Sequence, residues 1–183
     1  MSRIPGHTID DAPEASRPFL KEMIRFSPTG QPLNLHAQMA DSPAVLDAYA
    51  SLRGAAAAHG TLEHRLRAAL MLAAAVPSSS EYAITITSRL ALTAGWGEDQ
   101  VRSIRTGQPI GDDKVDALVA MLREAAQGCG RVSDASWTRA SCAGWTDQQL
   151  AESFLYLGLA LFTSYFLNYA ETDNDLPVRI PAG

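Results

Sequence analysis

One eight-residue motif of this sequence occurs in two similar copies, and each copy marks a corner between two helices. Ala94-Gly95-Trp96-Gly97-Glu98-Asp99-Gln100-Val101 is followed 49 residues later by the similar segment Ala143-Gly144-Trp145-Thr146-Asp147-Gln148-Gln149-Leu150. In both copies a helical pattern ends at glycine, which readily adopts the left-handed turn that follows a helix. A tryptophan at such a corner packs back across it. We therefore predict a duplicated helix-turn-helix unit in which both tryptophans are structural.

Other helix boundaries follow one another along the chain, and no segment has the alternation typical of a strand. Ser42-Pro43 predicts one helix start and Thr61 another. Ser78 with Glu81 has the pattern of a capping box, and so does the segment Thr146-Asp147-Gln148-Gln149. We expect an all-α, single-domain bundle of about seven or eight helices.

The chain divides into three expected segments. Residues 1–40 contain several prolines and predict an extended lead-in with one short helix from Glu14 to Phe26. Residues 41–172 form the helical domain. Residues 173–183 are polar and contain prolines, so we expect a tail that is loose or draped on a neighbouring molecule.

Composition excludes several classes of function. The chain has 183 residues and a net charge of −5, without a basic stripe, so nucleic acid is not an expected partner. The first residues lack the apolar core of a signal peptide. Cys129 and Cys142 do not have the spacing of a metal or redox site. We expect a cytoplasmic protein with two free, buried thiols.

Residues 154–169 form the most apolar stretch of the sequence. The stretch is shorter than the roughly 20 residues that span a bilayer, and it includes Thr163, Ser164 and Asn168. Its flanks are acidic, and no positive flank orients it in a membrane. We expect a soluble protein in which this helix is buried centrally or at a subunit interface.

The segment from Pro77 to Gly95 resembles the core helix of the alkylhydroperoxidase D and carboxymuconolactone decarboxylase superfamily. In the redox branch this helix opens with Cys-x-x-Cys and carries a histidine four residues on. The matching positions here hold Ser80, Ala83 and Thr87. The resemblance implies a helical bundle of the alkylhydroperoxidase D-like type and a homo-oligomer, since dimers, trimers and hexamers are known in the family.

Thiol peroxidase chemistry needs a low-pKa thiolate, a resolving cysteine, and a histidine and glutamate that move protons. The resemblance places Ser80 at the position of the thiolate, Ala83 at that of the resolving cysteine, Thr87 at that of the histidine and Ala68 at that of the glutamate. A serine hydroxyl does not ionise without a base, and threonine cannot be that base. A second branch of the family lacks the cysteines but keeps a Ser-Glu-Tyr sequence and the histidine. Ser80-Glu81-Tyr82 matches that sequence, but Thr87 occupies the position of the histidine. We therefore reject disulfide-based peroxidase chemistry.

Glu81 and Tyr82 are the best remaining catalytic candidates, as general base and as proton donor or oxyanion partner. The alternatives are a capping role for Glu81 and a packing role for Tyr82. Ser80, Ala83 and Thr87 share one helix face because they lie three and four residues apart. That face either lines a pocket for a compact ligand or admits a neighbouring helix closely.

Two further positions are candidates for ligand binding. Ala68 matches the family's upstream glutamate, and His36 lies in what reads as a loop bounded by prolines. The spacing of His59, Glu63 and His64 is not that of a zinc motif. We expect neither a metal nor another cofactor.

Three functions remain open. The first is a family member that has lost thiol peroxidase chemistry and serves in small-molecule binding or assembly. The second is a cofactor-free acid/base enzyme with decarboxylase, isomerase or lactone-type chemistry on a small organic substrate. The third is a residual alkylhydroperoxidase. A cavity that buries Glu81 and raises its pKa would favour the second.

Overall fold

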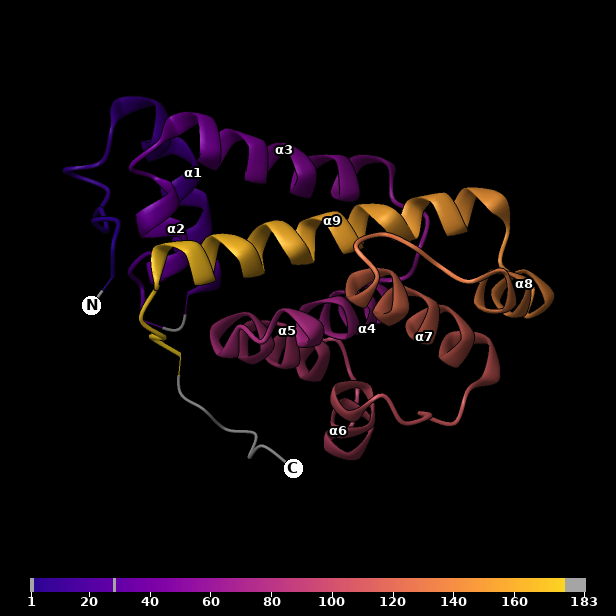
Figure 1. Ribbon diagram of the computed structural model, residues 1–183. Coiled ribbons are helices and arrows are strands. Elements are labelled where there is room, and N and C mark those ends of the chain that lie inside the picture. Colours follow the sequence, from indigo (N-terminus) through magenta and orange to yellow (C-terminus); the bar gives the residue numbers. More distant parts are fainter. Residues whose placement is uncertain (1, 28, 177–183) are drawn as a thin grey trace.

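Every regular element is helical in the residues that the computed structural model describes, 2–27 and 29–176 (Figure 1). The predicted all-α bundle is confirmed. Three short 3₁₀ turns adjoin the α-helices, at Glu14–Ser16, Ile24–Phe26 and Val76–Ser78. The α-helices of this part of the chain are α1 Arg17–Met23, α2 Asn34–Met39, α3 Pro43–His59, α4 His64–Ala75, α5 Glu81–Thr93, α6 Glu98–Thr106, α7 Asp113–Gln127, α8 Asp134–Cys142 and α9 Asp147–Ala170.

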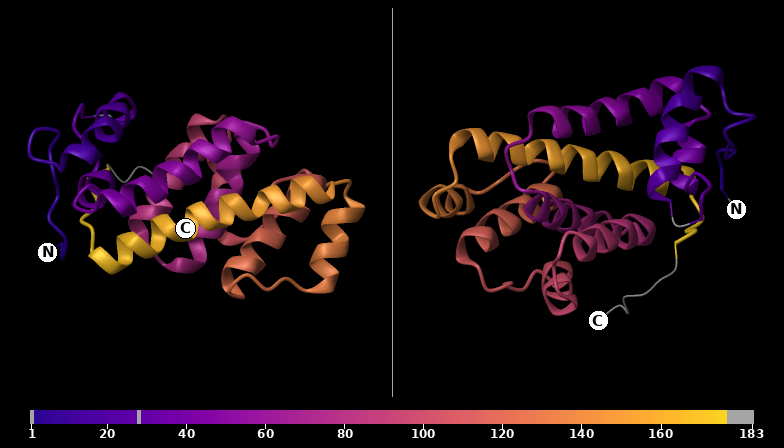
Figure 2. Two further views of the ribbon diagram at one scale, coloured as in Figure 1. Left: turned by 90° about the horizontal axis from the view of Figure 1, so that it is seen from above. Right: turned by 180° about the vertical axis from the view of Figure 1, so that it is seen from behind.

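The longest helix, α9, runs across the whole molecule. It packs against α3 on one side and against α4, α5 and α7 on the other (Figure 1). The views from above and from behind place α8 beside the first turns of α9 and the N-terminal segment beside its last turns (Figure 2). The helix therefore joins the two ends of the bundle.

Helix α4 lies at the centre of the core because it is built from small residues. Eight of its twelve residues are buried, and five of these are alanines. Short side chains let neighbouring helices approach closely, and α4 packs against α5, α7 and α9. A second buried cluster joins α2 and α3 to the C-terminal half of α9.

The repeated motif belongs to a larger structural repeat. The succession α4, α5, α6 is repeated by α7, α8, α9. Trp96 donates its indole N–H to the backbone oxygen of Arg65 at 2.7 Å, and Trp145 donates to that of Lys114 at 2.8 Å, in both cases across 31 residues. The same two cations lie 4.0 Å and 4.5 Å from the centres of the indole rings. The predicted structural role of both tryptophans is confirmed.

The predicted helix starts are partly confirmed. Thr146 and Gln149 form the expected capping box at the start of α9. The prediction for Thr61 is wrong, because Glu63 occupies the N-cap position of α4. Thr61 instead donates its backbone N–H and its hydroxyl to the carboxylate of Glu152, at 2.8 Å and 2.6 Å. A partner distant in the sequence thus takes the polar groups that a local cap would have used.

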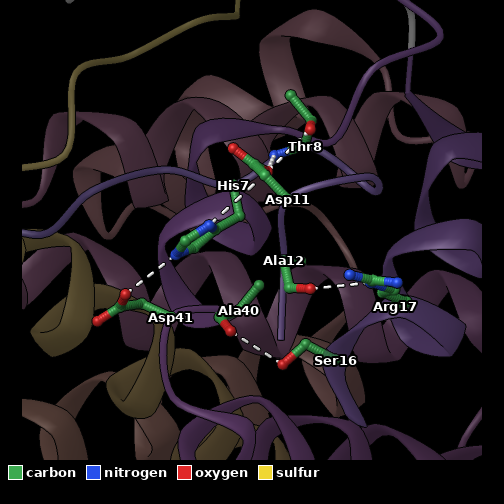
Figure 3. Close-up of polar contacts among 8 residues, drawn as sticks. All are labelled: His7, Thr8, Asp11, Ala12, Ser16, Arg17, Ala40 and Asp41. Carbon is green, nitrogen blue, oxygen red and sulfur yellow. Dashed lines mark hydrogen bonds and ion pairs between the residues drawn. The ribbon is translucent and has the colours of Figure 1, made fainter. Parts of the chain in front are cut away.

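The N-terminal lead-in is bound to the bundle, as Figure 3 shows. His7 contacts the carboxylate of Asp41 at 3.0 Å, and Ser16 donates its hydroxyl to the backbone oxygen of Ala40 at 2.9 Å. The predicted single helix from Glu14 to Phe26 is divided into α1 and two 3₁₀ turns. Sequence reasoning missed α2, which buries Leu35 to Met39. Residues 1–40 therefore supply part of the core.

The segment after α9 is tied to the same end of the bundle. Thr172 donates its hydroxyl to the side-chain oxygen of Gln38 at 2.5 Å. The side-chain amide of Asn34 donates to the backbone oxygen of Asp173 at 2.9 Å. Leu176 is buried. The prediction of a loose tail is therefore wrong for residues 173–176, and residues 177–183 lie outside the described residues.

Candidate functional site

The start of α5, where the family's cysteines would lie, is capped by a serine of this chain. Ser80 is the N-cap residue, and its hydroxyl oxygen accepts from the backbone N–H of Ala83 at 3.4 Å. The predicted capping box of Ser78 and Glu81 is wrong. Ser79 has a left-handed backbone (φ 54°) that ends the preceding 3₁₀ turn, so the helix begins two residues later than the box requires.

The predicted common face of α5 is confirmed. Ser80, Ala83 and Thr87 are each no more than 3% exposed. Thr87 donates its hydroxyl to the backbone oxygen of Ala83 at 2.7 Å. Both hydroxyl groups thus bond to the backbone of their own helix. Neither is poised to attack a substrate, because a nucleophilic hydroxyl needs an adjacent base.

The two predicted catalytic residues have different environments. Glu81 is in the first turn of α5 and its side chain is exposed, where a carboxylate is favoured by the helix dipole. Tyr82 is 3% exposed. Successive residues of a helix point about 100° apart. The structure therefore does not bring Glu81 and Tyr82 into one enclosed pocket.

Tyr82 contacts a carboxylate that sequence reasoning missed. Its hydroxyl donates to Asp175, whose other oxygen accepts the backbone N–H of Asn34 at 2.9 Å. Burial raises the pKa of Tyr82 far above its usual value, and the contact with Asp175 raises it further. At neutral pH the phenol therefore keeps its proton and serves as a hydrogen-bond donor to Asp175. The only signal in the sequence was the acidic composition around Asp175.

His36 is a buried, neutral imidazole. It lies in α2 and not in a loop, so that prediction is wrong. Its ring centre is 5.8 Å from that of Phe19 and 5.7 Å from that of Tyr49. Both ring nitrogens are buried and have no hydrogen-bond partner among the described residues. Burial, followed by the charge of Arg53, lowers the pKa of His36 to about 3.

Ala68 is separate from these groups. It is buried in the core cluster that α4 forms with α6, α7 and α9. Ala83 and Tyr82 belong to the other cluster, with the N-terminal helices. The site candidates are therefore divided between two parts of the core.

The two cysteines lie away from α5. Cys129 is in the turn between α7 and α8, and Cys142 ends α8. Both are free and exposed, so the prediction that they are buried is wrong. In the described part of the chain, no group of three or more metal-binding side chains comes together.

An open groove of about 500 Å³ lies between the start of α3 and the C-terminal half of α9. Most of its wall is apolar or aromatic. Two of its polar side chains are already engaged, because Gln38 accepts from Thr172 and Asp41 contacts His7. Such walls suit a small, largely apolar molecule. The groove is lined by Ile4, Gln38, Met39, Asp41, Ser42, Val45, Phe162, Tyr165, Phe166 and Tyr169.

Residues 43–124 match the model of the carboxymuconolactone decarboxylase family. No curated protein matches the chain significantly.

Among solved structures, the fold is similar to the alkylhydroperoxidase AhpD core of an uncharacterised peroxidase-related protein from Ralstonia eutropha JMP134. The TM-score is 0.81 at 14% identity, over 95% of this chain and 92% of that one. The debrominase Bmp8 in complex with 2,3,4-tribromopyrrole has a TM-score of 0.80 at 12% identity, over 96% of this chain and 92% of that one. A candidate AhpD antioxidant defence protein from Agrobacterium tumefaciens has a TM-score of 0.67 at 13% identity, over 74% of this chain and 94% of that one. At these identities the likeness concerns the fold.

Proposed function

Because the chain has an AhpD-like fold in which residues 43–124 match the model of the carboxymuconolactone decarboxylase family, we propose that it is a member that keeps this scaffold without thiol peroxidase chemistry. In our proposal it binds a compact aromatic molecule in the groove beside α9. It does so as a cytoplasmic homo-oligomer.

The buried face of α5 is the observation that best supports the proposed loss of peroxidase chemistry. The hydroxyls of Ser80 and Thr87 bond to backbone atoms, and Ala83 offers only a methyl group. Disulfide-based peroxidase chemistry uses a reactive cysteine with a resolving thiol near it. Both cysteines of this chain lie on other elements and are unpaired.

The walls of the groove support an aromatic ligand. Phe162, Phe166, Tyr165 and Tyr169 contribute rings from one helix, and aromatic pairs favour stacked or edge-on contact with a flat molecule. A structural neighbour, the debrominase Bmp8, is known in complex with 2,3,4-tribromopyrrole, which is such a molecule. The alternative of acid/base catalysis is less well supported, because the side chain of Glu81 is exposed and does not line an enclosed pocket in which a substrate could be held against it.

For the loss of peroxidase chemistry, we expect no consumption of cumene hydroperoxide above the buffer rate, with dithiothreitol as reductant. The double variant Cys129→Ser/Cys142→Ser should behave as the wild type, because neither thiol belongs to a redox pair. Peroxide consumption that disappears in the double variant would contradict the proposal.

For the groove, we expect 2,3,4-tribromopyrrole, used as a probe, to raise the thermal midpoint of unfolding of the wild type by a few degrees. Val45→Lys places a charge in the groove wall and should abolish the shift. The matched control is Ala44→Lys, which adds the same charge at an exposed neighbour outside the groove. Equal shifts in all three proteins would exclude the groove as the binding site.

A further inference from the structure

Helix α9 presents a row of aromatic side chains to solvent. Phe154, Tyr165 and Tyr169 are 66%, 56% and 73% exposed. Their spacing places them on one face of the helix, together with the half-buried Leu161 and Phe162. We call these five residues the α9 stripe. In Figure 1 no described helix crosses in front of this part of α9.

The α9 stripe lies in a segment without charge. Residues 153–170 contain no Asp, Glu, Lys or Arg, so α9 itself offers no ion that a partner would desolvate along the stripe. Gly158 lies on the same face, and a Cβ added there would meet nothing within 4 Å. A second helix can therefore approach α9 closely at this point.

We propose that a second copy of this chain covers the α9 stripe, with the two α9 helices antiparallel about a two-fold axis. The stripe extends from Phe154 to Tyr169, so its midpoint falls between Leu161 and Phe162. An axis at that midpoint sets Phe154 against the partner's Tyr169, and the reverse. A two-fold interface needs one surface that is complementary to itself, and this stripe is apolar on both sides of its midpoint.

The area of the stripe fits a dimer. Aromatic side chains bury roughly 150–250 Å² each, and these three are 66%, 56% and 73% exposed, so together they offer on the order of 400 Å² per copy. With the half-buried Leu161 and Phe162, two copies would together bury about 1,000 Å², the lower bound of a specific interface. A patch of about 400 Å² is as large as the largest apolar patch of a typical monomer.

A membrane is the competing occupant, and charge disfavours it. By length and composition, α9 is a helix that can cross a bilayer, but half of the relevant window is buried within the fold. Glu152 and Glu171 flank the apolar stretch of the helix, and the chain carries a net charge of −5. Helices that lie on membranes have basic residues on their polar face, which attract anionic lipids.

The dimer would also close the groove described above. Tyr165 and Tyr169 belong both to the stripe and to the groove wall. The partner's α9 would therefore cover the open side of each groove, and two ligand sites would lie at the interface. This part of the inference rests on the proposed ligand-binding function, and the dimer gives an interface to the homo-oligomer proposed there.

The first experiment measures mass by light scattering at micromolar concentration. We expect the wild type to have twice the monomer mass of 19.6 kDa. Tyr165→Lys should weaken dimerisation at least about tenfold, because it places two like charges in the interface. Trp137→Lys is the matched control, an exposed aromatic residue on α8 that should leave the dimer unchanged. A monomeric wild type, or a dimer that Tyr165→Lys does not weaken, would overturn the proposal.

The second experiment tests the antiparallel register by disulfide cross-linking, in a background with Cys129→Ser and Cys142→Ser. Leu161→Cys lies next to the proposed axis and should form a covalent dimer on mild oxidation. Phe154→Cys alone should not do so, but Phe154→Cys combined with Tyr169→Cys should. Leu90→Cys, an exposed position on α5, is the negative control. Cross-linking by Leu90→Cys to the same extent as Leu161→Cys would refute the register.

The third experiment separates the dimer from the ligand site. Val45→Lys should lose the shift caused by 2,3,4-tribromopyrrole, and Tyr165→Lys should lose both the shift and the dimer. Should the wild type dimerise without responding to the probe, the ligand site fails and the interface stands. Sedimentation of the wild type with vesicles of phosphatidylcholine and phosphatidylglycerol, without dimers in solution, would assign the stripe to a membrane and reject our proposal.

Discussion

Replacing Trp96 with alanine is expected to lower the free energy of unfolding by about 3–5 kcal/mol, as for other buried large aromatic residues. The indole is 6% exposed, its N–H bonds to the backbone oxygen of Arg65, and the guanidinium of Arg65 covers its face. The change therefore removes apolar burial, a hydrogen bond and a cation–π contact together. Urea unfolding at a fixed protein concentration measures the loss.

Three further variants test the cause. Trp145→Ala should cost a similar amount, because Trp145 makes the same two contacts with Lys114 in the second copy of the unit. Trp96→Phe keeps a ring but loses the N–H donor, and should cost about 1 kcal/mol for the hydrogen bond in addition to the lost volume. Trp137→Ala, at an exposed site, should cost roughly 0.5 kcal/mol. A Trp96→Ala variant no less stable than Trp137→Ala would contradict the structural role.

Acid is expected to destabilise the protein through His36. The pKa of His36 is about 3 in the folded state, compared with 6.5 for an unperturbed histidine. Between these values the unfolded chain binds the proton and the folded chain does not, so stability falls as the pH is lowered from 6.5 and this contribution levels off below about 3. The slope approaches about 1.4 kcal/mol per pH unit.

His36→Leu should remove this contribution, because leucine does not titrate and suits the apolar surroundings of Phe19 and Tyr49. The measurement is the free energy of unfolding at a series of pH values, for the wild type and the variant. His59→Leu, at an exposed position, is the matched control and should keep the slope of the wild type. Parallel curves for the wild type and His36→Leu between about pH 6 and pH 4, which lie between the two pKa values of His36, would show that another group causes the loss.

Features that depend on neighbouring residues could be predicted from the sequence. The corners at Gly95 and Gly144 and the cap at Thr146 depend on local backbone geometry, so the sequence predicted where the helices beside them end and begin. The common face of Ser80, Ala83 and Thr87 followed from helical spacing alone. The repeat was visible for the same reason, since both copies keep their corner residues.

Features that depend on distant partners could not be predicted. Asp175 meets Tyr82 across 93 residues, and Glu152 satisfies Thr61 across 91, so neither pair leaves a local pattern. Helix α2 was missed because it is short and follows a proline, and its formation depends on burial against α3 and α1. The groove was missed because its walls come from three segments that only the fold brings together.

The two ends of the described chain meet beside the groove. The backbone N–H of Arg3 donates to the oxygen of Ala170 at 2.8 Å, and the Arg3 guanidinium pairs with Glu171 at 2.5 Å. Ile4, the next residue, is part of the groove wall. An affinity tag fused ahead of Ser2 would consequently start at the mouth of the groove and compete with small molecules for it. Purified samples for screening compounds should therefore have such a tag cleaved off.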